Sequence, residues 1–284
     1  RQDLRGVIRR LPEHSRSILS CTRTTIPNAM KRTTLTTGLC IASFLGGPSY
    51  AHAEKADETI RLFNGKTLAG WHVSYRHEDM DKNLFTVHDN MIHVYERQTE
   101  RSEQTFAGLI TDESFSHYVL RLEYKWGAKK FAPRESYVRD SGVLFHVGQN
   151  ESIWPTSVEF QIQEGDTGDI WVLGTMVTSK VSRLRRNYDP EGELVTRGGP
   201  NNRYDRFHRG YQWEQPGWNR LELTVRGDHA VYKVNGMAVN EAIDMKYYDE
   251  TERSWRPLTE GKILLQAEGS EVYYRNITLT PLSN

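Results

Sequence analysis

Apolar and polar residues alternate along short stretches of the chain, and no long stretch places apolar residues at helical spacing. The clearest stretch is 119–126, where Leu120, Leu122, Tyr124 and Trp126 alternate with Arg121, Glu123 and Lys125. A period of two is typical of a strand with one buried face and one polar face. The pattern therefore predicts an all-β domain.

Two further stretches with polar side chains on one face follow in the middle of the chain. In 141–147, Val143, Phe145 and Val147 alternate with Leu144 and His146. In 158–163, Val158, Phe160 and Ile162 alternate with Glu159, Gln161 and Gln163. We expect Glu159, Gln161 and Gln163 to line one face of a strand, where they can meet a ligand.

The last third of the chain has the pattern of hairpins. Residues 221–225 and 230–234 are joined through Gly227-Asp228, and Asn235-Gly236 follows the second stretch. Asn-Gly suits a tight reversal because both residues adopt positive φ. Residues 262–266 and 272–279 complete the pattern, the latter with Tyr273, Arg275 and Ile277 on one face. We expect strands from the two ends of the domain to be neighbours, as in jelly rolls.

Between 174 and 216 the alternation stops, and Arg, Asn, Gly and Tyr dominate. A long loop inside a compact domain is usually functional or disordered. The interleaved aromatic residues favour an ordered lid or rim over a groove, with a solvated surface excursion as the alternative. His208 lies in this segment and is a candidate sugar contact.

The N-terminal part of the chain has the features of an export signal. Met30-Lys31-Arg32 precedes the apolar stretch 35–45, and Ala51-His52-Ala53 supplies a small-x-small cleavage pattern. We therefore expect residues 1–29 to be an upstream extension foreign to the fold, 30–53 a signal peptide, and 54–284 the mature domain. The apolar stretch is shorter than the ~20 residues of a membrane span, so the sequence predicts a secreted or periplasmic protein.

Charge and cysteine content exclude several classes of function for the domain. Residues 54–284 carry 29 basic and 35 acidic side chains, hence a formal charge of about −6, which disfavours non-specific nucleic-acid binding. Cys21 and Cys40 are the only cysteines, so the domain has no disulfide, thiolate metal site or catalytic cysteine. The phosphate-binding and dinucleotide-binding glycine motifs are also missing.

Several short motifs, in order along nearly the whole domain, carry a resemblance to a known family. The stretch 62–71, LFNGKTLAGW, looks like the family's opening LFNGKsLxGW, and DSGVLF at 140–145 is similar to its NSGixfR strand. VEFQI at 158–162 with TGDI at 167–170 resembles EvQixD…tGxiy, and GWN at 217–219 resembles geWN. Asn235-Gly236, GKILLQ at 261–266 and YRNI at 274–277 match the closing NG…GxIxLQ…FRNI. The domain thus resembles the 3-keto-disaccharide hydrolase family, also described as 3-keto-glucoside 1,2-lyase or 3-keto-2-hydroxyglucal hydratase.

The resemblance implies a single concanavalin-A-like jelly-roll β-sandwich and a saccharide substrate. It also implies cleavage of 3-keto-glucosides by removal of the C2 proton, elimination of the group on C1, and hydration. The sequence departs from the family at two positions: Asp140 stands where Asn is usual, and His146 stands at or near the usual Arg. Both departures alter the polar contacts of one end of the groove.

The residues on the strand at 158–163 bear on the same chemistry. Glycosidases of this fold commonly carry E-x-D-x-E on a strand, whereas this chain has Glu159-x-Gln161-x-Gln163. Direct two-carboxylate hydrolysis by that pattern is disfavoured, but elimination next to a ketone needs one base. We expect Glu159 or His146 to transfer the proton, with Asp140, Gln161 and Gln266 as substrate contacts.

Other parts of the site remain open from sequence alone. The developing enolate needs a positive or hydrogen-bonding partner, for which Arg275, His146 or a divalent metal ion are candidates. His146 and Glu159 on neighbouring strands are the residues that would converge on such a metal. Trp154 and Trp213, near loops, are candidates for stacking on sugar rings. The alternative function is a lectin-like module that binds sugar without chemistry, with Glu159 in an ordinary cross-strand ion pair.

Overall fold

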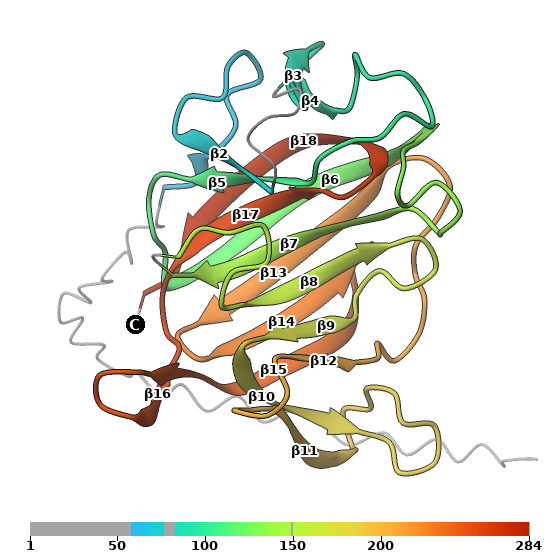
Figure 1. The fold of residues 1–284 in the computed structure, drawn as a ribbon. Coiled ribbons are helices and arrows are strands. Elements are labelled where there is room, and N and C mark those ends of the chain that lie inside the picture. Colours follow the sequence, from blue (N-terminus) through green and yellow to red (C-terminus); the bar gives the residue numbers. More distant parts are fainter. Residues whose placement is uncertain (1–57, 77–82, 149, 284) are drawn as a thin grey trace, which may run out of the picture. The chain divides into compact units, whose positions relative to one another are not determined.

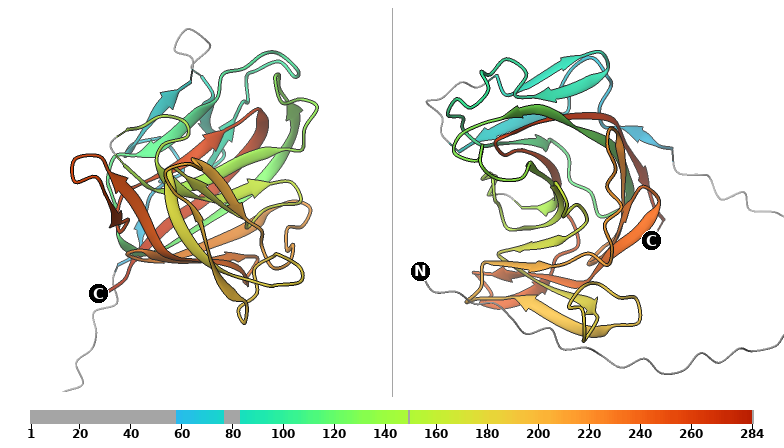
Figure 2. Two further views of the ribbon diagram at one scale, coloured as in Figure 1. Left: turned by 60° about the horizontal axis from the view of Figure 1, so that its bottom comes forward. Right: turned by 90° about the vertical axis from the view of Figure 1, so that its right-hand side faces the viewer.

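Strands with one apolar face are stable when two sheets stack and bury these faces against each other. The computed structural model describes residues 58–76, 83–148 and 150–283, and over these residues it has eighteen strands in two antiparallel sheets. Figures 1 and 2 show the smaller sheet lying over the larger one. The all-β prediction is confirmed.

The larger sheet has eleven strands, in the spatial order β11-β10-β15-β14-β13-β6-β18-β4-β3, with β1 added to β18 and β16 to β15. Their bounds are β1 Ile60–Arg61, β3 Phe85–His88, β4 Met91–Val94, β6 His117–Lys130, β10 Thr175–Val181, β11 Glu193–Gly198, β13 Asn219–Arg226, β14 His229–Val234, β15 Met237–Asp249, β16 Ser254–Pro257 and β18 Ser270–Pro281.

The smaller sheet has seven strands, in the order β12-β9-β8-β7-β17-β5-β2. Their bounds are β2 Trp71–Tyr75, β5 Ala107–Thr111, β7 Asp140–Val147, β8 Ser157–Gln163, β9 Ile170–Leu173, β12 Tyr204–Phe207 and β17 Lys262–Ala267. Between the sheets lies one core of buried apolar side chains, in which the smaller sheet contributes residues such as Phe145, Phe160 and Leu265. The residues that alternate with these face outward and form the floor of the site described below.

The strands expected from alternation are present close to the expected bounds. β6 contains 119–126 with Leu120, Leu122 and Tyr124 buried, and β13 and β14 form the expected hairpin. Asn235 and Gly236 have φ of 50° and 86°, as the tight turn requires. Ile60 of β1 pairs with Leu279 of β18, so strands from the two ends of the domain are neighbours. The expected concanavalin-A-like jelly-roll sandwich is thus confirmed.

Two irregularities shift side chains to the face opposite the expected one. β7 and β17 slip in register between Lys262 and Leu264, and His146 has a φ of 54°. β18 slips against β6 between Arg275 and Thr278, and Asn276 has a φ of 54°. Each extra residue reverses the alternation. His146 therefore leaves the face of Leu144, and Ile277 enters the core instead of sharing the face of Arg275.

The segment 174–216 is not the single long loop that the sequence suggested. It contains β10 and β11 at the edge of the larger sheet and β12 at the edge of the smaller one. Polar side chains on these strands hide the alternation, because β11 and β12 are edge strands with exposed faces.

The expected upstream extension and signal peptide, residues 1–53, lie outside the described residues. Among the described residues, none forms a helix of the length and apolar character that a membrane crossing requires.

Candidate functional site

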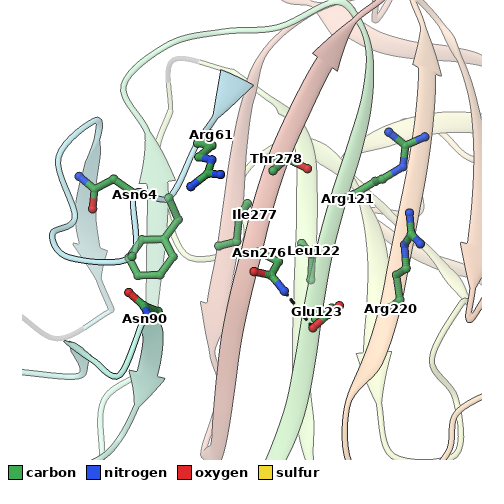
Figure 3. A pocket seen from close by; sticks show the side chains of 12 residues that line it. Arg61, Asn64, Asn90, Arg121, Leu122, Glu123, Arg220, Asn276, Ile277 and Thr278 are labelled. Atoms are coloured by element: carbon green, nitrogen blue, oxygen red, sulfur yellow. Dashed lines mark hydrogen bonds between the residues drawn. The ribbon is translucent and has the colours of Figure 1, made fainter. Parts of the chain in front are cut away.

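Two hollows of similar size lie on opposite outer faces of the sandwich. One, of about 550 Å³, lies on the larger sheet and is lined by Arg61, Arg121 and Glu123, among others (Figure 3). Two of its charged side chains have partners: Glu123 Oε2 accepts from Asn276 Nδ2 at 3.2 Å, and Arg121 Nε donates to Glu222 Oε2 at 2.7 Å. Glu123, the one carboxyl group among the described residues that line this hollow, is therefore already engaged.

The second hollow, of about 420 Å³, lies on the outer face of the smaller sheet, and we call it the groove. Its floor and walls come from β7, β8, β9, β12 and the segments next to β6 and β17. The lining residues are Arg134, Asp140, Trp154, Glu159, Gln161, Gln163, Trp171, Leu173, Tyr204 and Glu268. Three carboxyl groups, one guanidinium and three aromatic rings in one hollow make it the better candidate site.

Asp140, at the start of β7, is held by a set of donors. Gln161 Nε2 and Gln163 Nε2 of β8 donate to its two oxygens at 2.8 and 2.9 Å, and Arg134 Nη2 also donates to it. Burial raises the pKa of Asp140, while Arg134 and the two amides favour its charged form. Gln161 and Gln163 thus each use an amide group to position Asp140.

Glu268, just after β17, shares Arg134 with Asp140. Arg134 Nη1 donates to Glu268 Oε1 at 2.9 Å, and the indole N–H of Trp154 donates to the same carboxyl group. Burial, reinforced by the negative charge of Asp140, raises the pKa of Glu268 to about 8. At neutral pH Glu268 is therefore mostly protonated, as a general acid must be.

Glu159, in the middle of β8, is the least committed carboxyl group of the groove. It is buried, and no hydrogen bond from the described part of the chain reaches it. Burial, and then the charges of Glu268 and Asp140, raise its pKa well above the usual value, against the opposing effect of Arg206 and Arg134. A carboxyl group with free oxygens and a perturbed pKa is suited to proton transfer.

Glu159 and Gln266 meet over Gly142, where β7 has no side chain. A Cβ atom at Gly142 would lie 2.1 Å from Glu159 Oε1 and 2.3 Å from Gln266 Oε1, closer than any carbon can approach. Both polar atoms of the Gln266 amide are buried without a partner among the described residues. Glycine at this position therefore makes room for a carboxyl group and an uncommitted amide side by side.

The loop between β7 and β8 covers the other half of the same face. The Glu151 carboxylate accepts a hydrogen bond from Lys262 Nζ at 2.5 Å, and the Glu151 backbone carbonyl accepts one from Ser74 Oγ at 2.6 Å. Beneath this region lies a second apolar cluster that includes Ile110, Leu144 and Leu264. The groove is thus confined to the part of the sheet around β7, β8 and β9.

A dense ion-pair cluster borders the groove beyond β9. Asp169 is fully buried, and it accepts from Arg206 Nε at 2.6 Å and Arg209 Nη1 at 2.8 Å. The Arg206 guanidinium lies 5.2 Å from the ring centre of Trp171, so it packs against that groove ring. His208 Nδ1 lies 3.0 Å from Asp169 Oδ2, which places this half-exposed histidine next to the groove but outside its lining.

The structure brings together five of the residues proposed from sequence and separates four. Those in or at the groove are Asp140, Trp154, Glu159, Gln161 and Gln266. His146 instead faces the opposite sheet, with Nε2 2.9 Å from the Gly227 carbonyl oxygen, and burial lowers its pKa to about 4. His146 and Glu159 therefore do not converge on a shared metal position.

The other residues outside the groove are His208, Arg275 and Trp213. Arg275 lies on the outer face of the larger sheet, where Nε donates to Glu123 at 2.7 Å and the guanidinium stacks on Trp218, 3.8 Å from the ring centre. The carbonyl of Trp213 accepts from Asn235 Nδ2 at the β14–β15 turn. None of the three lines the groove.

Sequence reasoning missed several groove residues. Glu268 lies two positions after Gln266, and this period-two spacing is the signal that could have found it. Trp171 pairs with Glu159 across β8 and β9. Arg134 lies in an irregular segment without a local signature. With Asp140 and Glu268 beside Glu159, the groove has enough carboxyl groups for acid and base roles, so the single carboxylate on β8 does not by itself exclude two-carboxylate chemistry.

Residues 58–280 match the model of a family described as the 3-keto-alpha-glucoside-1,2-lyase-like domain. Among curated proteins, none matches the chain.

Two solved structures show similarity to this chain at low sequence identity. A candidate glycosyl hydrolase from Parabacteroides distasonis has 19% identity and a TM-score of 0.48, covering 79% of this chain and 94% of its own. A laminarinase from Flavobacterium sp. UMI-01 has 13% identity and a TM-score of 0.46, covering 80% of this chain and 100% of its own.

Proposed function

Because the chain belongs to the 3-keto-alpha-glucoside-1,2-lyase-like family, we propose that its groove cleaves 3-keto-glucosides by elimination and then hydrates the product. The observation that carries the proposal is the buried, uncommitted carboxyl group of Glu159 beside the uncommitted amide of Gln266, over the glycine at 142. A ketone at C3 acidifies the C2 proton, so that one base and one hydrogen-bond donor suffice for the first step.

Glu159 is the base of the proposed reaction. Its carboxylate takes the proton from C2, and the C–H electron pair forms the enolate of the C3 ketone. Its oxygens carry no donor from the described residues, and its raised pKa makes it a stronger base than an exposed glutamate. Gln266 Nε2, which has no partner there either, donates to the developing oxygen charge.

Glu268 is the acid of the proposed reaction. The enolate collapses to restore the C3 ketone, a C1–C2 double bond forms, and the C1–O bond breaks. Glu268, protonated because its pKa is about 8, delivers its proton to the departing oxygen. Arg134 and Trp154 then stabilise the carboxylate that remains, since both donate to it.

Hydration reverses these roles. Water adds its oxygen to C1 of the 2-hydroxyglucal ketone and gives a proton to Glu268, while Glu159, after exchanging its proton with solvent, protonates C2. The sum is hydrolysis of the glycosidic bond, without a covalent sugar–enzyme intermediate. The rings of Trp154 and Trp171 are the surfaces on which the sugar would stack.

The test compares 3-keto-trehalose and 3-keto-glucosides with the same sugars unoxidised, in deuterated water. We expect turnover of the 3-keto sugars alone, with deuterium at C2 of the product. Cleavage of unoxidised trehalose at a comparable rate, or product without label at C2, would favour the two-carboxylate route that Asp140, Glu159 and Glu268 permit. Binding of both sugars without turnover of either would favour the lectin-like alternative.

A further inference from the structure

A cluster of two histidines and a glutamate lies on the outer face of the larger sheet, at the edge formed by β3 and β4 (Figure 1). His88 ends β3, His93 is the third residue of β4, and Glu96 follows that strand. One possible ligand atom of each residue lies within 4.8 Å of the other two.

The spacing of these three atoms is that of metal ligands. His88 Nε2 lies 3.3 Å from His93 Nδ1 and 3.0 Å from Glu96 Oε1, and His93 Nδ1 lies 3.8 Å from Glu96 Oε1. Ligands of a tetrahedral Zn²⁺ with bonds of about 2.0–2.1 Å are separated by about 3.4 Å, so the three distances scatter around that value. Two imidazoles and one carboxylate also form a donor set that zinc favours.

Two of the three ligands are oriented by a second group. His93 Nε2 lies 2.8 Å from Glu271 Oε1, and because the carboxylate can only accept, Nε2 carries the proton and Nδ1 presents its lone pair to the centre. Thr86 Oγ1 donates to Glu96 Oε2 at 2.5 Å, which leaves Oε1 for the centre. Tyr273 stacks on His93 with ring centres 4.1 Å apart. Carboxylate–histidine pairs of this kind fix metal-binding imidazoles in the correct tautomer.

We propose that His88, His93 and Glu96 bind a tetrahedral divalent ion of the zinc class. The fourth position opens to water, because the side chains of His88 and Glu96 are 39% and 32% exposed whereas that of His93 is 8% exposed. The ion joins β3, β4 and the segment after β4, and through Glu271 it connects them to β18. The site lies on the sheet opposite the groove, so it acts on stability and not on the proposed reaction.

The test is titration of the metal-free, untagged full chain with Co²⁺, followed by displacement with Zn²⁺. We expect one Co²⁺ per chain with the intense visible absorption of a tetrahedral site, and loss of this absorption on adding Zn²⁺. At a free Zn²⁺ concentration one hundred times its Kd, the melting temperature of the protein should rise by about 5–10 °C.

Variants separate this site from other ligands in the chain. His88→Ala and Glu96→Gln, both at partly exposed positions, should abolish the absorption while the protein stays folded, and binding at Cys21 or Cys40 would persist in them. Glu271→Gln should lower the affinity about 10–100-fold, since its amide N–H would push the imidazole proton onto Nδ1. The matched control is His229→Ala, which removes a histidine that lies 2.8 Å from Glu241 and has no third ligand among the residues that the structure describes.

Absence of saturable Co²⁺ binding would overturn the proposal. An affinity unchanged in His88→Ala and Glu96→Gln, or lowered equally by His229→Ala, would do the same.

Discussion

Replacement of Glu159 by glutamine removes the proposed base and keeps the shape of the side chain. The amide fits the same space over Gly142, and it breaks no hydrogen bond among the described residues. We expect turnover of 3-keto-glucosides to fall by about 10²–10⁴-fold, the usual contribution of a positioned proton-transfer group. The assay measures the initial rate of 3-keto-glucose release at saturating substrate, and circular dichroism checks that the variant is folded.

The same substitution should change stability with a defined dependence on pH. The pKa of Glu159 is raised in the folded state, so its contribution is most favourable below pH 4.5 and is lost as pH rises toward the folded pKa. Each tenfold decrease in the acid dissociation constant of Glu159 on folding lowers the stability of the wild type by about 1.4 kcal/mol at pH values above that range. Glu159→Gln should therefore melt at the same temperature as the wild type near pH 4. At pH 8 the variant should melt about 3–6 °C above the wild type if folding lowers the acid dissociation constant of Glu159 about tenfold. A larger decrease in that constant would give a larger difference in melting temperature.

Glu222→Gln is the matched control, because folding moves the pKa of Glu222 in the opposite direction. Glu222 pairs with Arg121 and Lys233, and although burial opposes them, these cations lower the pKa of its carboxyl group. The variant should lose stability at pH 7, match the wild type in acid, and keep full turnover. Near-normal turnover in folded Glu159→Gln would refute the assignment of the base, and a melting difference independent of pH would refute the burial reasoning.

Four other outcomes are expected. Gly142→Ala should lower turnover by about 10²-fold by displacing Glu159 and Gln266, whereas Gly148→Ala, with open space at its Cβ, should not. Trp171→Ala should raise KM about 3–10-fold with little change in kcat. His146→Gln should lower the melting temperature and leave turnover intact, because His146 bonds only the Gly227 carbonyl among the described residues. The intact mass of the exported protein should correspond to a chain that begins at Glu54, and a start before Met30 would contradict the proposed signal peptide.

Alternation and turn residues were sufficient to predict most strands, since burial of one face imposes a period of two. The prediction was wrong where one residue was inserted. His146 and Asn276 adopt positive φ without being glycine, and nothing in the neighbouring sequence marks them. Each insertion reversed the alternation, so His146, a candidate catalytic residue, was placed on the wrong face of β7, and Ile277 on the wrong face of β18.

The groove itself depends on which strands are neighbours. Glu159, Asp140 and Glu268 come together because β8, β7 and β17 are adjacent strands. Glu159 and Glu268 are nevertheless separated by 109 positions in the sequence. A single sequence carries the period of each strand but not the order of the sheet. Glu159 was therefore predictable as a groove residue, whereas its partnership with Glu268 and Arg134 was not.

The position of β18 in the larger sheet has a consequence for how the protein is made. β18 lies between β6 and β4 and also pairs with β1, so Leu120 finds its partner Leu279 only when the chain is nearly complete. Contacts over such sequence distances slow folding, because the loop must close before the contact contributes. On the ribosome, β1 and the β3–β4 hairpin have no neighbour in the sheet until residues 270–281 have been synthesised. A chain that stops before Ser270 would leave the edge of β6 unpaired and open to aggregation with other chains.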